Sequence, residues 1–234
     1  MSPDPQGQVE VSLGSPRVHF RCTDSTNLHA RELAAGGAPH GTLVTASEQS
    51  AGRGRQGRTW AAPAGRALLS SLVLRDPPRL LPLAAGVAVA ELAGPQARVK
   101  WPNDVLVERR KVAGILVEGR PQERWAVLGI GLNVALRDED FPPELRDTAG
   151  TLALAPEAVE ATLTRLLELL AHWIRAEPEA VLDAVRNRDA LLHHRVRWAG
   201  GAGHAAGIDG DGRLLVATDA GQVALEAGEV HLIR

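Results

Sequence analysis

The apolar positions along the chain alternate in some segments and recur every three or four residues in others. Alternating or continuous apolar runs predict strands at 17–22, 42–47, 67–74, 97–101 and 124–134. Helical spacing predicts helices at about 26–35, 80–92, 156–175 and 178–191. Strands interleaved with helices in this way indicate a mixed α/β (α+β) fold.

Two further segments have recognisable turn signals. Residues 103–118 predict a hairpin, with its turn at 108–110 and both arms apolar enough to lie in a covered sheet. After about residue 190 the pattern changes to short strands separated by glycine turns such as Asp209-Gly210 and Asp211-Gly212, which is typical of a small antiparallel barrel. We therefore expect a domain at 1–190 and a second one at 191–234.

The first helix is preceded by the tetrapeptide DSTN at 24–27. Aspartate, serine and threonine are good N-cap residues because a side-chain oxygen can accept a hydrogen bond from a free backbone N–H of the first turn. We expect one of Asp24, Ser25 and Thr26 to cap this helix. The Gly36-Gly37 pair should end it.

The segment GRGRQGRTW at 52–60 fits the dinucleotide pattern G-x-G-x-x-G. It also nearly fits the phosphate-loop pattern, with Arg58 in place of the required lysine. Both motifs need a helix directly after the glycines, but Pro63 and Gly65 disfavour one. The loop is therefore neither motif. Its free backbone N–H groups and its three arginines, at 53, 55 and 58, predict that the loop binds an anion. The alternative is a mobile surface loop that binds RNA or nothing.

Polar residues interrupt three other apolar segments: KWPNDV at 100–105, KVAGILVEG at 111–119 and GIGLNV at 129–134. Buried polar groups need partners, so these groups either satisfy one another or face a ligand. Lys100 and Lys111 are the only lysines in a chain that otherwise uses arginine. A compact ammonium at these two positions indicates a tight site that a guanidinium would not fit.

Composition excludes several classes of protein. The formal net charge of −2 gives no overall attraction to nucleic acid or to anionic membranes. The single cysteine, Cys22, excludes an internal disulfide, and no Cys/His cluster has zinc-ligand spacing. There is no signal peptide and no apolar run of about 18 residues. We expect a cytoplasmic protein without a protein-bound metal and without a membrane partner.

In order and spacing, DSTN, EQSAGRGRQGRTW, KWPNDV, KVAGILVE and GIGLNV resemble the biotin protein ligases. The resemblance covers residues 18–134 closely and residues 191–234 more loosely, as an SH3-like domain. It implies a mixed-sheet catalytic domain of the biotin/lipoate ligase type followed by a small SH3-like β-barrel. It also implies that biotin and ATP, assisted by Mg²⁺, form biotinyl-5'-AMP, from which biotin passes to a lysine of a biotin carboxyl carrier domain.

The resemblance assigns a role to each candidate residue. The implied catalytic residues are Lys111, Arg53, Arg55 and Asp104, of which Asp104 would orient or deprotonate the acceptor lysine. The implied biotin-binding residues are Ser25, Thr26, Asn27, Gln49, Gly52, Arg53, Gly54, Arg55, Lys111, Gly114, Ile115, Leu116 and Gly129. The implied ATP-binding residues are Arg55, Arg58, Trp60, Lys100, Asn103, Lys111 and Asn133, although Asn133 could instead tie a strand end.

Two departures from the family pattern and two rival functions accompany this interpretation. Gln56 stands where some relatives have a third arginine, and only about 17 residues precede the catalytic region, so we expect no DNA-binding domain. A lipoate or octanoate ligase or transferase is the enzymatic rival, and GRGRQGR with KWPND argues against it. An RNA-binding module is the other rival, and the scarcity of Phe and Tyr argues against that. The sequence does not decide whether the chain forms a homodimer.

Overall fold

A seven-stranded mixed sheet organises most of the chain in the computed structural model, which describes residues 13–233. Its strands are β1 (Arg17–Phe20), β2 (Leu43–Ala46), β3 (Ala67–Arg75), β4 (Arg98–Lys100), β5 (Asp104–Val107), β6 (Arg110–Arg120) and β7 (Trp125–Asn133). The order is β1-β2-β3-β7-β6-β5-β4, in which β1 and β2 run parallel and every other pair is antiparallel. The predicted mixed sheet and the predicted hairpin at 103–118 are confirmed.

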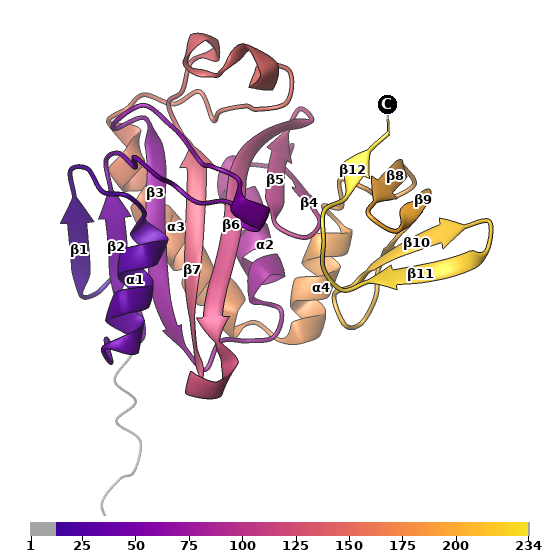
Figure 1. Cartoon of the computed structure of the whole chain (residues 1–234), viewed down its shortest axis with the longest axis horizontal. Helices are drawn as coiled ribbons and strands as arrows, with labels where there is room; N and C mark the ends of the chain where they lie inside the picture. Colours follow the sequence, from indigo (N-terminus) through magenta and orange to yellow (C-terminus); the bar gives the residue numbers. More distant parts are fainter. Residues whose placement is uncertain (1–12, 234) are drawn as a thin grey trace, which may run out of the picture.

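Helices lie on both faces of this sheet (Figure 1). The helix α1 (Thr26–Ala35) covers one face, while α2 (Leu81–Ala93) and α3 (Ala158–Arg175) cover the other and α4 (Pro178–Arg186) packs on α2. Strand β7 is apolar on both sides because Val127 contacts the α1 layer and the next residue, Leu128, belongs to the larger core. No helix among residues 13–233 combines the length and the apolarity needed to cross a membrane.

Of two local predictions about helix ends, an N-cap among residues 24–26 is confirmed in position but not in its side-chain bond, and the end of α4 is wrong. Ser25 is the N-cap residue of α1, but no side chain caps the helix; the carboxylate of Asp24 instead accepts a hydrogen bond from the Ser25 backbone N–H, over 2.6 Å. Helix α4 ends at Arg186 rather than near 191. Its continuation pairs with β4: the Ala190 N–H donates to Val99 O over 3.0 Å, whereas in a helix continued to 191 it would donate to Arg186 O.

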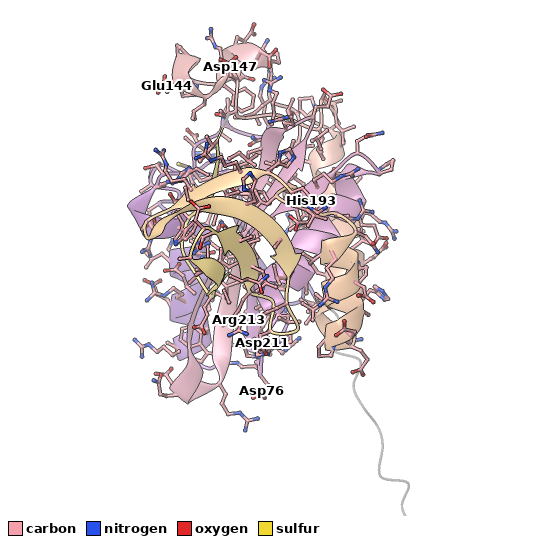
Figure 2. All side chains as sticks on the ribbon, turned by 90° about the vertical axis from the view of Figure 1, so that its right-hand side faces the viewer. Asp76, Glu144, Asp147, His193, Asp211 and Arg213 are labelled. Atoms are coloured by element: carbon pink, nitrogen blue, oxygen red, sulfur yellow. The ribbon has the colours of Figure 1, made fainter. Side chains whose placement is uncertain are left out.

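A second sheet follows α4, as the glycine turns predicted. It contains β8 (Arg195–Trp198), β9 (Gly201–Ile208), β10 (Leu214–Thr218), β11 (Gly221–Leu225) and β12 (His231–Leu232), all antiparallel, in the order β11-β10-β9-β8-β12. Figure 2 views the molecule from this side and shows Asp211 and Arg213 close together at the β9–β10 turn. Asp209 organises that turn by accepting a hydrogen bond from Arg213 Nε over 2.7 Å.

The second sheet shares a continuous apolar core with the helices of the first part. Leu214 and Val216 of β10 belong to the same buried cluster as Leu182 of α4. The β9–β10 turn also touches the first part directly, because Trp101 Nε1 donates to Gly212 O over 2.9 Å. This packing brings the end of the chain beside strands β4 and β5, where the polar motifs converge.

Candidate active site

A pocket opens on the same face of the sheet as α1, above β3, β7 and β6. Three strand glycines, at 114, 129 and 131, lie on this face and carry no side chain to fill it. The lining residues are Ser25, Thr26, Asn27, Gln49, Arg53, Gly54, Arg55, Arg58, Thr59, Trp60, Leu69, Ser70, Lys100, Trp101, Pro102, Asn103, Asp104, Lys111, Gly114, Ile115, Leu116, Gly129, Ile130, Gly131, Glu229, Val230 and His231. Residues from every polar motif of the sequence thus meet at one place.

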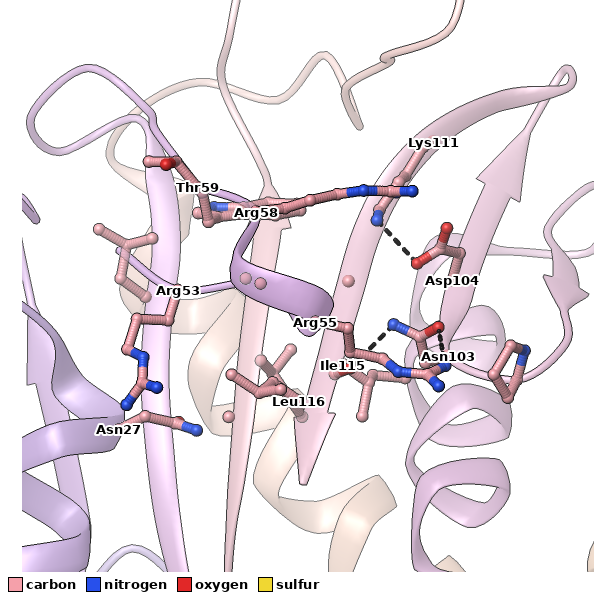
Figure 3. Close-up of a pocket in the computed structure, with 18 of the residues that line it drawn as sticks. Asn27, Arg53, Arg55, Arg58, Thr59, Asn103, Asp104, Lys111, Ile115 and Leu116 are labelled. Atoms are coloured by element: carbon pink, nitrogen blue, oxygen red, sulfur yellow. Dashed lines mark hydrogen bonds and ion pairs between the residues drawn. The ribbon is translucent and has the colours of Figure 1, made fainter. Parts of the chain in front are cut away.

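The segment 52–60, here called the arginine loop, folds across this pocket as a narrow hairpin (Figure 3). The N–H of Gly54 donates to Arg58 O over 2.7 Å, and the N–H of Trp60 donates to Gly52 O over 2.9 Å. The short 3₁₀ helix η1 (Arg55–Gly57) forms its tip, with Gln56 in the left-handed region at φ 53°. The chain then continues to β3 without a helix, so neither phosphate-binding motif is present, as predicted.

Each arginine of the loop reaches a different acceptor. Arg53 Nη1 lies 3.5 Å from Glu118 Oε1, and Arg55 Nη1 donates to Asn103 Oδ1 over 2.9 Å. Arg58 forms an ion pair with Glu229, which comes from the segment just before β12. The loop is therefore tied to β6, to the β4–β5 connection and to the C-terminal sheet, which keeps three guanidinium groups around one cavity.

The indole of Trp60 lies flat against two facing glycines. A Cβ atom at Gly131 would stand 2.5 Å from Trp60 Cε2, and one at Gly114 would stand 3.0 Å from Cζ3. Trp60 Nε1 is buried and has no hydrogen-bond partner in the described structure. Since a buried indole N–H normally finds an acceptor, this group is free to bind an acceptor atom of a ligand.

Both lysines of the chain line the pocket. Lys111 Nζ is 2.7 Å from Asp104 Oδ1 and 5.7 Å from the centre of the Trp60 ring. Burial lowers the pKa of Lys100 below its ordinary value; Asp104 and Glu229 oppose this shift, and Lys111 and Arg58 add to it. Two ammonium groups at close quarters form a site of concentrated positive charge that an anion would stabilise.

The opposite end of the pocket carries neutral polar groups, and the guanidinium of Arg53 lies beside Asn27 there, paired with Glu118 (Figure 3). Ser25, Thr26 and Asn27 are each less than 5% exposed. Gln49 Oε1 accepts the backbone N–H of Thr26 over 2.8 Å, so its amide nitrogen remains available as a donor. A ligand that fits this pocket would present uncharged donors and acceptors at one end and an anionic group at the other.

Most of the predicted site residues meet here, and two do not line the pocket. Asn133 is buried and donates from Nδ2 to Gly150 O over 2.8 Å, the strand-tying role that the sequence left open. Gly52 is the first residue of the arginine loop, where a Cβ atom would stand 2.2 Å from Trp60 O. Its place is thus fixed by packing within the loop.

The C-terminal segment 229–231 also lines the pocket, although no sequence motif predicts it. Glu229 is paired with Arg58, and His231 Nε2 lies 3.4 Å from Glu229 Oε2. Nothing near residue 230 signals a site, because the contact depends on how the second sheet packs. Two other unpredicted residues, Ser71 and Glu118, lie just behind the lining and bond to it.

Comparison with known proteins yields two family matches. The model of the biotin/lipoate A/B protein ligase family matches residues 19–134, and the model of the biotin protein ligase C-terminal domain matches residues 202–232. The first range holds nearly all of the pocket, and the second holds the segment that closes it.

Individual relatives agree with these matches. The bifunctional ligase/repressor BirA of Bacillus subtilis is 34% identical, covering 94% of this chain and 75% of its own length. The biotin–[acetyl-CoA-carboxylase] ligase of Mycobacterium tuberculosis is 36% identical, covering 91% of this chain and 87% of its own length. The structure of the Aquifex aeolicus biotin protein ligase in complex with biotin and ATP superposes with a TM-score of 0.77 at 28% identity, covering 93% of this chain and 98% of that one.

Proposed function

Because this chain belongs to the biotin/lipoate A/B protein ligase family, we propose that it activates biotin with ATP and transfers the biotinyl group to one lysine of a biotin carboxyl carrier domain. In the first step a carboxylate oxygen of biotin attacks the α-phosphorus of ATP, and pyrophosphate leaves. In the second step the lysine amine attacks the acyl carbon, loses a proton, and AMP leaves. The product is an amide on the carrier.

The observation that carries this proposal is the polarity of the pocket: neutral hydrogen-bonding groups at one end, and Lys100, Lys111 and Arg55 at the other. The fused rings of biotin are uncharged and would bind at the neutral end, beside Ser25 and Thr26. Its carboxylate and the triphosphate repel each other. Cations fixed around the reacting phosphorus offset that repulsion and stabilise charge that develops in the transition state.

The remaining lining residues fit the same geometry. Arg53 would approach the carboxylate from the loop, and the unpartnered N–H of Trp60 would serve the nucleotide. Asp104, which is paired with Lys111, is the acceptor available for the proton that the carrier lysine loses. A loop that folds over the site keeps water from a reactive acyl phosphate.

Mg²⁺ enters this proposal as part of the ATP substrate. No group of three or more histidine, cysteine or acidic side chains that could hold a metal ion occurs among residues 13–233. Magnesium in nucleotide sites is bound largely through phosphate oxygens and water, so such a group is not required. A reaction that consumes ATP is consistent with action in the cytoplasm.

The direct test is to incubate the protein with biotin, Mg-ATP and a biotin carboxyl carrier domain, and to detect product with labelled streptavidin. We expect one biotin per carrier, and none on a carrier whose acceptor lysine is replaced by arginine. Parallel reactions with lipoate and octanoate should give no product. Modification of the carrier by lipoate in preference to biotin would overturn the proposal.

A further inference from the structure

Three of the polar groups that line the pocket lie on one short hairpin, formed by β4 and β5. Lys100 is the last residue of β4 and Asp104 is the first residue of β5, and the two are paired across the hairpin. Asn103 belongs to the tip, residues 101–103, and its Oδ1 accepts from Arg55 Nη1 over 2.9 Å. A displacement of the β4–β5 hairpin would therefore move all three groups together.

The sheet holds this hairpin on one side only. Strand β4 is the last strand in the order of the described sheet, so β5 is its one neighbour there. The outer edge of β4 pairs at a single point, Val99, with Asp189 of the segment after α4. An edge strand leaves many of its backbone N–H and C=O groups without a strand partner. The tip of the hairpin is therefore held largely by its own side chains.

Trp101, the first residue of the tip, anchors it to the second sheet. The Trp101 side chain is 3% exposed and belongs to the main apolar core. Its Nε1 donates to Gly212 O in the β9–β10 turn over 2.9 Å, and Figure 1 shows β4 beside the second sheet. A buried indole combines a large apolar contact with one directional hydrogen bond, so its position is closely defined.

The acceptor of this bond belongs to a peptide group that is itself held in place. The carbonyl of Gly212 and the N–H of Arg213 form one planar trans unit. That N–H donates to Asp209 Oδ1 over 2.9 Å, and the same oxygen accepts from the backbone N–H of Asp211 over 2.9 Å. Because the N–H and C=O of a trans peptide point in opposite directions, the bond to Asp209 aims the carbonyl at Trp101.

The β9–β10 turn is also fixed against the first part of the chain. Gly212 has a φ of 80°, in the left-handed region that favours glycine. A Cβ atom there would stand 2.7 Å from Leu80 Cδ2 and 3.0 Å from Leu83 Cδ1. Arg79 Nη1 donates to Asp211 O over 2.6 Å. The turn thus packs against the start of α2 and gives the hairpin a fixed point of attachment.

We propose that Asp209 and Trp101 are positioning residues for the β4–β5 hairpin. Asp209 orients the 212–213 peptide, and this peptide holds the indole of Trp101. The indole in turn sets the place of Asn103 and Asp104. The proposal rests on the proposed function and deepens it, because it gives the second sheet a part in both chemical steps: Asn103 would serve the nucleotide in the first, and Asp104 would accept the lysine proton in the second.

The first test is Trp101→Phe, which keeps an aromatic ring in the core and deletes the N–H. We expect single-turnover formation of biotinyl-5'-AMP, and its transfer to the carrier, to slow about tenfold to a hundredfold, because a misplacement of about 1 Å can cost that much. The dissociation constant of biotin, measured by titration calorimetry, should scarcely change, since the neutral end of the pocket comes from other segments.

Trp125→Phe is the matched control. Trp125 is also 3% exposed, and its Nε1 donates to Glu123 Oε2 over 2.7 Å, but it does not line the pocket. Both rates should be unchanged in this variant, and unfolding temperatures show whether each variant is folded. Equal slowing in the two tryptophan variants would overturn the proposal, because the loss would then come from general destabilisation.

Two substitutions at Asp209, which does not line the pocket, test the path from the turn. Asp209→Ala removes the acceptor of the Arg213 N–H, whereas Asp209→Asn keeps a side-chain oxygen for it and loses the charge. We expect Asp209→Ala to slow both steps about tenfold and Asp209→Asn to retain most of the wild-type rate. In a Trp101→Phe background, the further effect of Asp209→Ala should nearly vanish. Fully additive effects, or wild-type rates in Asp209→Ala, would overturn the proposal.

Solvent exchange of the Trp101 indole N–H, followed by NMR on the full chain, tests the same path without any measurement of activity. We expect faster exchange in Asp209→Ala and wild-type exchange in Asp209→Asn. Unchanged protection in Asp209→Ala would overturn the proposal, and this comparison remains available if Trp101→Phe does not fold. A wild-type protein that shows the expected exchange but forms no biotinyl-5'-AMP would overturn the proposed function, and with it the roles given to Asn103 and Asp104, but not the link between the two sheets.

Discussion

Gly114 on β6 and Gly131 on β7 are directly paired across the sheet, and the indole of Trp60 lies on both of them. The pair forms a flat patch of backbone at the floor of the pocket. A side chain at either position would occupy the place of the ring. Gly114 of KVAGILVE and Gly131 of GIGLNV therefore serve to position an aromatic residue of the arginine loop.

Gly131→Ala tests this relationship. Its Cβ would stand 2.5 Å from Trp60 Cε2, and the strand backbone is held by β3 and β6, so the indole must move. We expect the apparent affinity for ATP to fall about tenfold, the size of a typical overpacking cost, with little change in unfolding temperature. Biotin-dependent exchange of pyrophosphate into ATP measures this.

The matched control is Gly210→Ala, since a Cβ atom there would have nothing within 4 Å. It should leave the exchange rate unchanged. An unaltered rate in Gly131→Ala would mean that the position of Trp60 is unimportant for adenylation.

Lys111 should be sensitive to both truncation and enlargement. Its ammonium lies 2.7 Å from Asp104 Oδ1 and 5.7 Å from the centre of the Trp60 ring, and a planar guanidinium would not place its charge at the same point. We expect Lys111→Ala to lower the rate of adenylate formation by about a hundredfold to a thousandfold, which is the usual loss for one preorganised donor. Lys111→Arg should also be poor. Single-turnover formation of biotinyl-5'-AMP measures the step, and near wild-type rates in both variants would contradict the role.

Glu229 should hold the arginine loop closed from the C-terminal sheet. Its partner Arg58 is 55% exposed, so the pair is worth only about 0–1 kcal/mol, and Glu229→Gln should scarcely change the unfolding temperature. We expect the adenylate to escape faster in the absence of carrier, by at most about fivefold, the factor that corresponds to about 1 kcal/mol.

Asp211→Asn is the comparison for this prediction. It removes an ion pair with Arg79 that also joins the second sheet to the first part, between two residues that do not line the pocket. If both variants release the adenylate equally fast, the effect comes from general loosening between the sheets and not from the loop.

The residues that could be predicted from the sequence share a local signature. Lys111 is a polar residue inside an apolar strand, Asn103 lies between two apolar strands, and Arg55 belongs to a glycine-rich loop, so each one breaks a pattern that its neighbours establish. The strands and long helices were predictable for the same reason, because alternation and helical spacing are properties of short segments.

The residues that could not be predicted depend on tertiary contacts. Glu229 reaches Arg58 only because the second sheet packs on α2 and α4, over a separation of 171 residues. Ser71 lies in an apolar strand, where one serine is not unusual, and only its contacts with Thr26 and Asn27 place it beside the pocket. Helix α4 ends early because its next residues pair with β4, a competition that periodicity does not reveal.

Asp189, in that same paired segment, gives a prediction about pH. Burial raises the pKa of its carboxyl above the ordinary value, although the backbone N–H groups of Leu191 and Leu192 oppose the shift. Its Oδ1 accepts from Leu191 N over 2.7 Å, while Oδ2 is buried without a partner in the described structure. The ionised form is thus the one that the fold disfavours.

The direction in which stability changes with pH follows from the number of protons that the folded and the unfolded state bind. Between pH 3.8 and the raised pKa the folded state holds the proton more tightly than the unfolded chain, so this group lowers stability as pH rises through that window. Asp189→Asn keeps an acceptor for Leu191 N but carries no charge. We expect it to raise the free energy of unfolding by about 1 kcal/mol at neutral pH and to lose that advantage below pH 3.8. Urea unfolding across this range measures the difference, and a variant that is less stable than wild type at pH 7 would show that the charge on Asp189 is accommodated.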